Sequence, residues 1–178
     1  IILSEIDRVE DFIKNFLKFA KPTDPDFIKS NPSLIISEVI ILLKSRFKEK
    51  KISVEFVDEN SNYEVMADSG QLKQLFMNLL INALEAMPQE GNITIYSKVE
   101  TQSEKQYLKI SVEDTGPGIP ENIIKSLFEP FVKGNEQGVG LGLSISQNIA
   151  TMHHGWIQAE NKPNKAGAIF NVFLPTIS

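Results

Sequence analysis

The chain has 178 residues, of which 42% are hydrophobic and 23% charged, with a formal net charge of −5. This length is enough for one domain with its own hydrophobic core. The acidic balance and the lack of a basic stripe argue against a general nucleic-acid binder, and the absence of cysteine excludes disulfides and thiolate metal sites. No apolar run is long enough to span a membrane and no signal peptide is found, so we expect this part of the chain to be cytoplasmic and without membrane contact.

The first twenty residues carry a heptad pattern. Apolar residues recur at alternating spacings of four and three: Ile2, Ile6, Val9, Ile13, Phe16 and Ala20. This spacing predicts a helix over residues 1–20 that packs in a helical bundle, either between chains or on its own domain. Residues 21–26 contain two prolines and predict a linker, so residues 27–178 form the second unit.

A strand is predicted at residues 27–30, and Asn31 with Pro32 predicts the start of a helix that reaches residue 50. Alternating apolar residues from Ile52 predict a strand, and residues 63–67 predict a weaker one. Asp68 followed by Gln71 has the pattern of a capping box, so a helix is expected from there to Pro88.

The helix after Asp68 is apolar nearly all round except for one polar stripe: Gln71, Gln74, Asn78, Asn82 and Glu85. A helix of this kind is buried, so its polar stripe must face a ligand, a partner or ordered water. Amide oxygens suit Mg²⁺, a role that Asn82 fits. The alternative is that Asn78 and Asn82 are buried amides that tie down a loop.

Strands are predicted from Gly91 and over residues 108–112, joined by a hairpin at residues 101–105. The second strand runs into Asp114, Gly116 and Gly118. A carboxylate at a strand end can accept hydrogen bonds from a planar ring edge such as an exocyclic amine, and the glycines let the backbone approach a flat ligand. A plain turn is the alternative. A short helix is predicted to follow from Pro120.

Three spaced glycines, Gly138, Gly140 and Gly142, precede a helix that ends near His154. Backbone N–H groups in such a segment can converge on an anion at the positive end of a helix; a flexible hinge is the alternative. The segment is neither a Walker loop nor a dinucleotide fingerprint. Two closing strands are predicted, at residues 156–160 and 168–174.

The amide stripe, the carboxylate with its glycines and the glycine segment together indicate a site for one nucleoside triphosphate. Strand pairs adjacent in sequence and separated by long helices predict an α+β fold, a two-layer sandwich with helices on one face of a mixed sheet.

Four motifs occur in a fixed order: Asn78-x-x-x-Asn82, Asp114-x-Gly116-x-Gly118, Phe128-x-x-Phe131 and Gly138-x-Gly140-x-Gly142. They resemble the N, G1, F and G2 boxes of sensor histidine kinases, which belong to the Bergerat-type ATP-binding superfamily. The resemblance covers residues 27–178, and residues 1–20 are similar to the later part of the second helix of the dimerisation and histidine-phosphotransfer domain.

This resemblance implies the Bergerat fold, a mixed and mainly antiparallel sheet covered on one face by three helices, with ATP and Mg²⁺ as ligands. It implies that Asp114 binds the adenine amino group and that Asn82 ligates Mg²⁺, with Asn78 and Glu85 acting through water. The other nucleotide-binding residues it implies are Gly116, Gly118 and Ile119 beside the base, Phe131 and Lys133 in the lid, and Gly138, Val139, Gly140, Leu141 and Gly142 around the phosphates. The lid lacks the Thr-Thr-Lys that many relatives carry, and Glu85 stands where some relatives have lysine.

The implied reaction is transfer of the γ-phosphoryl group of ATP to a histidine, followed by relay to an aspartate of a response regulator, in a protein that dimerises through the helical bundle. The only histidines are His153 and His154, which adjoin a helix end where a cation would suit the helix dipole. We expect both to be structural and the phosphoacceptor to lie upstream of Ile1. This chain should then bind Mg-ATP without phosphorylating itself.

Three other classes of protein are alternatives to a histidine kinase. Hydrolytic Bergerat-type ATPases carry a glutamate at the position of Asn78 to activate water, whereas an amide cannot act as a general base. Anti-sigma-type serine kinases share the boxes but lack the leading heptad helix. A non-catalytic adaptor is disfavoured by Asn82, Asp114 and the three G2 glycines.

Overall fold

A computed structural model describes residues 24–59, 62–132, 140–163 and 166–177. The helix predicted at residues 1–20 and residues 21–23 of the predicted linker lie outside these residues, and both stay predictions. The described elements, in chain order, are β1 (Ile28–Ser30), α2 (Pro32–Glu49), β2 (Ile52–Asp58), β3 (Val65–Ala67), α3 (Ser69–Ala86), β4 (Gly91–Gln102), β5 (Lys105–Asp114), α4 (Gly142–Met152), β6 (Trp156–Asn161) and β7 (Ala168–Pro175).

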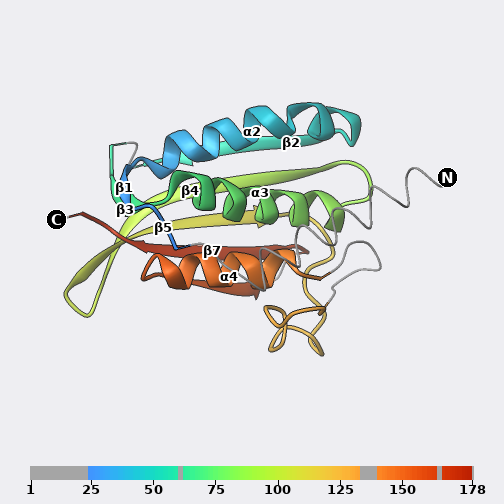
Figure 1. Cartoon of the computed structure of the whole chain (residues 1–178). Helices are drawn as coiled ribbons and strands as arrows, with labels where there is room; N and C mark the ends of the chain where they lie inside the picture. Colours follow the sequence, from blue (N-terminus) through green and yellow to red (C-terminus); the bar gives the residue numbers. More distant parts are fainter. Residues whose placement is uncertain (1–23, 60–61, 133–139, 164–165, 178) are drawn as a thin grey trace, which may run out of the picture.

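A five-stranded mixed sheet forms one layer of the molecule. Its strand order is β2-β4-β5-β7-β6, in which β2 and β4 are parallel and every other pair is antiparallel. Figure 1 shows α2, α3 and α4 side by side over the same face of this sheet, with α3 in the middle. The predicted two-layer α+β sandwich, with a mainly antiparallel sheet and three helices on one face, is confirmed. Strands β1 and β3 add a small antiparallel sheet of their own.

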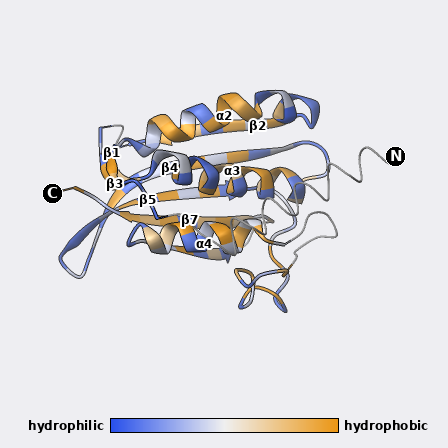
Figure 2. Cartoon of the chain, viewed as in Figure 1, coloured by the Kyte–Doolittle hydropathy of each residue, from blue (hydrophilic) through white to orange (hydrophobic). Residues whose placement is uncertain are grey.

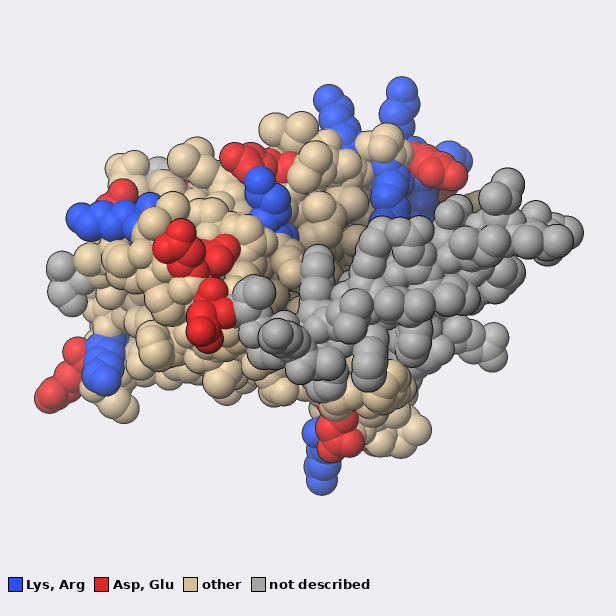
Figure 3. All heavy atoms as spheres, in the orientation of Figure 1, with Lys and Arg blue, Asp and Glu red and all other residues tan. Residues whose placement is uncertain are grey.

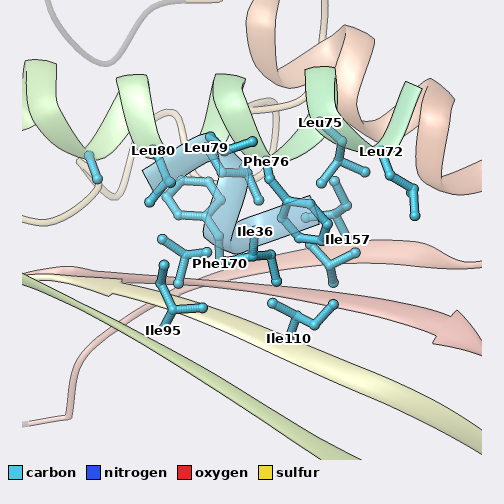
Figure 4. Packing of buried hydrophobic residues seen from close by; sticks show 14 of the residues in the cluster. Ile36, Leu72, Leu75, Phe76, Leu79, Leu80, Ile95, Ile110, Ile157 and Phe170 are labelled. Atoms are coloured by element: carbon cyan, nitrogen blue, oxygen red, sulfur yellow. The ribbon is translucent and has the colours of Figure 1, made fainter. Parts of the chain in front are cut away.

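The core lies between α3 and the sheet. Leu72, Leu75, Phe76, Leu79 and Leu80 on α3 are each at most 1% exposed. Figure 4 shows these side chains pointing toward apolar residues of four strands: Ile95, Ile110, Ile157 and Phe170. Full burial of one such side chain stabilises the fold by about 1.5–3 kcal/mol. The middle helix is therefore held rigidly, and its polar stripe is fixed relative to the strand ends.

Local sequence signals set the helix boundaries. The Asn31 side chain accepts hydrogen bonds from the N–H groups of Ser33 and Leu34, and Pro32 opens α2, as predicted. The Asp68 carboxylate accepts a hydrogen bond from the N–H group of Gln71 at 2.9 Å, which confirms that α3 begins beside Asp68.

The helix predicted from Pro120 is wrong. Residues 121–131 form consecutive turns, in which N–H groups bond mostly to the carbonyl three residues earlier, as from Ile123 to Pro120 and from Glu129 to Ser126. The physical reason is that Leu127 packs into the core while Ile123 and Phe128 cover it from the turns, and that Pro130 interrupts any longer run of helical hydrogen bonds. Tertiary packing thus replaces the helical ladder here.

Charged side chains of both signs lie on the face drawn in Figure 3, in small groups separated by uncharged residues. In Figure 2 the tip of the β4–β5 hairpin is hydrophilic, whereas much of β7 is hydrophobic. Within the described ranges no helix has both the length and the apolar character needed to cross a bilayer.

His153 connects the end of α4 to the beginning of α3. Its Nδ1 lies 2.8 Å from the carbonyl oxygen of Ile149, and its Nε2 accepts a hydrogen bond from the N–H group of Asp68 at 3.0 Å. Because Nε2 is the acceptor, the ring is neutral with its proton on Nδ1. The structural role expected for this residue is confirmed, but a charged imidazole at this helix end is not: burial lowers the pKa of His153, His154 adds to the decrease, and Ile149 and Asp68 oppose it.

This arrangement predicts an acid-dependent loss of stability. The folded state binds the His153 proton less readily than the unfolded chain, whose histidine has a pKa of about 6.5, so the free energy of unfolding should fall as the pH drops below that value. Urea unfolding between pH 7.5 and pH 5 measures the slope. His153→Gln should be less stable at pH 7.5 and should have a smaller slope over this range. An unchanged slope in His153→Gln would show that other groups control the dependence.

Candidate functional site

Asp114 is the last residue of the central strand β5 and is only 2% exposed. One carboxylate oxygen, Oδ1, accepts hydrogen bonds from two backbone N–H groups, that of Gly116 at 2.8 Å and that of Ala168 at 3.3 Å. Within the described part of the chain, the second oxygen, Oδ2, accepts no hydrogen bond. A carboxylate fixed through one oxygen presents the other to a ligand.

Opposing effects act on the acidity of this carboxyl group. Burial raises the pKa of Asp114 above its ordinary value, while the N–H groups of Gly116 and Ala168 and the charge of Lys162 oppose the increase. The Lys162 Nζ lies 3.2 Å from Oε2 of Glu113, and both side chains are largely buried. A buried carboxylate of this kind is able to recognise a hydrogen-bond donor strongly, because water competes with the ligand less than at the surface.

The loop after Asp114 packs against the C-terminal end of α3. A Cβ placed on Gly116 would lie 3.3 Å from the carbonyl oxygen of Ala86 and 3.4 Å from its Cβ. Gly118 has a positive φ of 86°, a conformation that favours glycine. These glycines therefore bring the loop backbone close to Ala86 and Asn161, and Ile119, which the resemblance placed beside the base, is 8% exposed.

The other end of the polar stripe contacts α4. The Asn78 Nδ2 donates hydrogen bonds to the carbonyl oxygen of Gly142 at 3.1 Å and to the hydroxyl of Ser146 at 3.3 Å. Asn78 thus ties α3 to the start of α4. Asn82 lies one turn further along α3, is partly exposed and makes no side-chain hydrogen bond to another described residue.

This part of α3 lies between the N-terminus of α4, which contacts Asn78, and the loop after Asp114, which contacts Ala86. At a rise of 1.5 Å per residue, the axial distance from Asn78 to Ala86 is about 12 Å. Leu141, the residue that precedes α4, makes no side-chain capping hydrogen bond. The first N–H groups of α4 are then suited to bind an anion.

The segment before α4 is described only in part. Gly140 has a positive φ of 76°, and its carbonyl oxygen accepts a hydrogen bond from the N–H group of Phe131 at 2.9 Å. A Cβ on Gly140 would come within 2.7 Å of the carbonyl oxygen of Val132, so only glycine fits there. Phe131 is 54% exposed. The predicted phosphate contacts Lys133, Gly138 and Val139 lie outside the described residues.

Glu85 and Asn82 were both predicted to serve a metal ion. They lie on α3 between Asn78 and Ala86 and are partly exposed. In the described part of the chain, no three acidic or histidine side chains come together in a way that could hold a metal ion. A magnesium ion here would need phosphate oxygens and water in addition to the Asn82 amide.

Three residues of the site were not singled out from the sequence. Ser146 binds the same carbonyl as Asn78, with its hydroxyl donating to the carbonyl oxygen of Gly142 at 2.9 Å. Asn161 and Lys162 come from the end of β6 and contact the Asp114 region. For Ser146 the spacing of four from Gly142 was a weak signal, while Asn161 and Lys162 enter the site only through strand pairing.

Comparisons with known proteins agree with this geometry. Residues 67–178 match the family described as histidine kinase-, DNA gyrase B- and HSP90-like ATPases. The chain belongs to this family, and its membership supports ATP as the ligand.

The chain is also similar to individual histidine kinases, in sequence and in structure. The chain is 34% identical to sporulation kinase A of Bacillus subtilis (strain 168) over 98% of its own length and 28% of that protein's length. It is similar to the catalytic domain of histidine kinase ThkA, with a TM-score of 0.75 and 34% identity over 84% of this chain and 95% of that domain. A crystal structure of ThkA in complex with the response regulator protein TrrA has a TM-score of 0.80 and 32% identity over 99% of this chain and 49% of that one.

Proposed function

We propose that this chain is the ATP-binding catalytic domain of a sensor histidine kinase. The observation that carries the proposal is the Asp114 carboxylate, held through Oδ1 by two backbone N–H groups at one end of the amide stripe, with the uncapped start of α4 at the other end. In this proposal Asp114 accepts the adenine amino group, and Gly118 and Ile119 lie beside the ring. The backbone N–H groups at the start of α4 bind phosphate.

The donor set fits a nucleotide-bound magnesium ion. The Asn82 amide makes no hydrogen bond to the described residues and lies between the proposed base end and the proposed phosphate end of the stripe. We assign Asn82 as the protein ligand of Mg²⁺, with Asn78 and Glu85 acting through water. The ion, when bound, neutralises charge on the phosphates. The chain itself orients the triphosphate and excludes water, which is the main contribution of protein groups to phosphoryl transfer.

The position of Asn78 favours phosphoryl transfer to a protein side chain over hydrolysis. Its amide nitrogen is occupied by Gly142 and Ser146, and an amide group cannot remove a proton from water. In this proposal the phosphoacceptor is a histidine that is not among residues 1–178. The similarity to ThkA, solved in complex with a response regulator protein, supports a receiver domain as the next acceptor. Dimerisation through the bundle and a cytoplasmic location belong to the same proposal.

Calorimetric titration with ATP, with and without Mg²⁺, tests the nucleotide site. Wild-type protein should bind ATP more tightly with Mg²⁺ than without it. Asn82→Ala should lose most of this magnesium-dependent gain and keep the magnesium-free affinity, because it loses only the metal ligand. Gln74→Ala removes an amide from the same stripe about 12 Å away and serves as the matched control. If wild-type protein binds no ATP, the proposed function is wrong.

Transfer of radiolabelled phosphate separates the kinase from the hydrolytic alternative. A polypeptide that also contains the proposed phosphoacceptor histidine should acquire acid-labile phosphate from labelled ATP and pass it to a receiver domain. The present chain alone should acquire none. Fast steady-state ATP hydrolysis by the chain, abolished in Asn78→Ala, would instead assign it to the hydrolytic ATPases.

A further inference from the structure

The loop that follows Asp114 is held at both of its ends by one pair of facing residues in the β6–β7 hairpin. Asn161 ends β6 and pairs with Ala168, which begins β7. The N–H group of Ala168 donates to Asp114 at the start of the loop. The Asn161 side chain contacts the far end, where its Oδ1 accepts from the N–H group of Ile119 at 2.6 Å and its Nδ2 donates to the carbonyl oxygen of Ile119 at 2.9 Å.

The contact between Asn161 and the loop is close as well as doubly hydrogen-bonded. A Cβ on Gly118 would lie 2.7 Å from the Asn161 Oδ1, so the loop backbone rests directly on the amide group. One hydrogen bond to the N–H group of Ile119 and one to its carbonyl oxygen together fix the position and the orientation of this residue. Asn161 itself is exposed, which means that its loss removes little core packing.

Neighbouring contacts keep the hairpin end in place. The N–H group of Lys162 donates to the carbonyl oxygen of Gly167 at 3.0 Å, and the Lys162 side chain pairs with Glu113. The hairpin end is therefore attached to β5 by the Glu113 ion pair, to Asp114 by Ala168 and to the loop by Asn161. Loss of the Asn161 amide would therefore release only the attachment to the loop.

We propose that Asn161 is a positioning residue of the nucleotide site, which sets the affinity for the adenine base by fixing the loop from Asp114 to Ile119. This inference rests on the proposed function. Asn161 is assigned no contact with the nucleotide; it acts through the backbone of Ile119. Its effect should therefore be confined to ligands that contain the base.

The test compares ATP, adenosine and inorganic tripolyphosphate as ligands of the wild-type chain and of Asn161→Ala. Asn161→Ala should weaken ATP and adenosine binding by the same factor of about ten, and should change tripolyphosphate affinity by less than about twofold. Asn161→Asp keeps the acceptor for the Ile119 N–H group and loses the donor, so it should recover part of the affinity for adenosine.

Asn171→Ala is the matched control. Asn171 is a buried amide in β7 that also makes two side-chain hydrogen bonds, accepting from Ser111 at 2.6 Å and donating to Glu160 at 3.1 Å, none of them to the loop. Its replacement should lower the unfolding temperature and leave adenosine affinity unchanged.

Any of three outcomes would overturn the inference while leaving the proposed function intact. In the first, Asn161→Ala binds ATP and adenosine as the wild type does. In the second, Asn161→Ala weakens tripolyphosphate and adenosine binding equally, and in the third, Asn171→Ala weakens adenosine binding as much as Asn161→Ala does. The last two would show an effect of general stability. If the wild-type chain binds none of the three ligands, the failure is that of the proposed function.

Discussion

Asp114→Asn is expected to weaken ATP binding by about 10- to 100-fold, the loss that corresponds to a hydrogen bond with a charged partner. Asparagine can keep the contacts that Oδ1 makes with Gly116 and Ala168. Its amide nitrogen would then occupy the position of Oδ2, and this donor would face the donor of the base. Calorimetric titration measures the change, and the unfolding temperature should not fall, because a buried charge is removed.

Glu113→Gln provides the control for this substitution. Glu113 adjoins Asp114 on β5 and carries the same charge, but its partner is Lys162. Its replacement should change ATP affinity by no more than about threefold, because it leaves the hydrogen bonds of the Asp114 carboxylate to Gly116 and Ala168 in place. Because burial raises the pKa of Asp114, wild-type affinity should begin to decline on acidification at a higher pH than for an ordinary aspartate. Equal affinities of Asp114→Asn and wild type for ATP would remove Asp114 from the site.

Gly155→Ala is expected to destabilise the fold by about 3 kcal/mol, at the upper end of the cost of overpacking. Gly155 joins α4 to β6, and its N–H group donates to the carbonyl oxygen of Ala150. A Cβ there would lie 1.9 Å from the carbonyl oxygen of Phe173, which belongs to the backbone of β7. Neither side has a flexible side chain that could move away, so α4 must shift relative to the sheet. Urea unfolding at neutral pH measures the loss.

Gly70→Ala is the comparison for this stability effect. A Cβ on Gly70 would lie 3.2 Å from the side-chain Oδ1 of Asp68, a group that can adjust. Alanine also favours a helix over glycine by about 1 kcal/mol. The net change in the free energy of unfolding should therefore stay within about 1 kcal/mol. A Gly155→Ala protein as stable as Gly70→Ala would show that α4 has room to move.

Much of the fold could be predicted because its signals are local. Asn31 with Pro32, and Asp68 with Gln71, mark helix starts through hydrogen bonds within a few residues, and both were found in the structure. The alternating strands around Ile95 and Ile110 were also predictable, because one face of each strand is buried against the helices. The segment after Pro120 could not be assigned in this way, since its apolar residues are compatible with either a helix or packed turns.

In the candidate site, too, only the residues that are neighbours in the chain gave a recognisable sequence pattern. Asp114 and its glycines are adjacent in the chain, so the motif was visible in the sequence. Asn161 reaches Ile119 across 42 positions, and the contact exists only because β6 pairs with β7 and β7 pairs with β5. An exposed asparagine at a strand end has no distinguishing pattern of its own. Asn78 shows a further limit, because its spacing indicated a site but gave no sign that its amide nitrogen binds Gly142.

Strand β5 is hydrogen-bonded to β4 on one side and to β7 on the other. Backbone protons in such a central strand exchange with solvent only when most of the domain opens, whereas side-chain links between helices are lost in smaller fluctuations. The two ends of the site therefore have different lifetimes. The carboxylate end persists for as long as the sheet does, while the junction of Asn78 with Gly142 can open and close many times within that period.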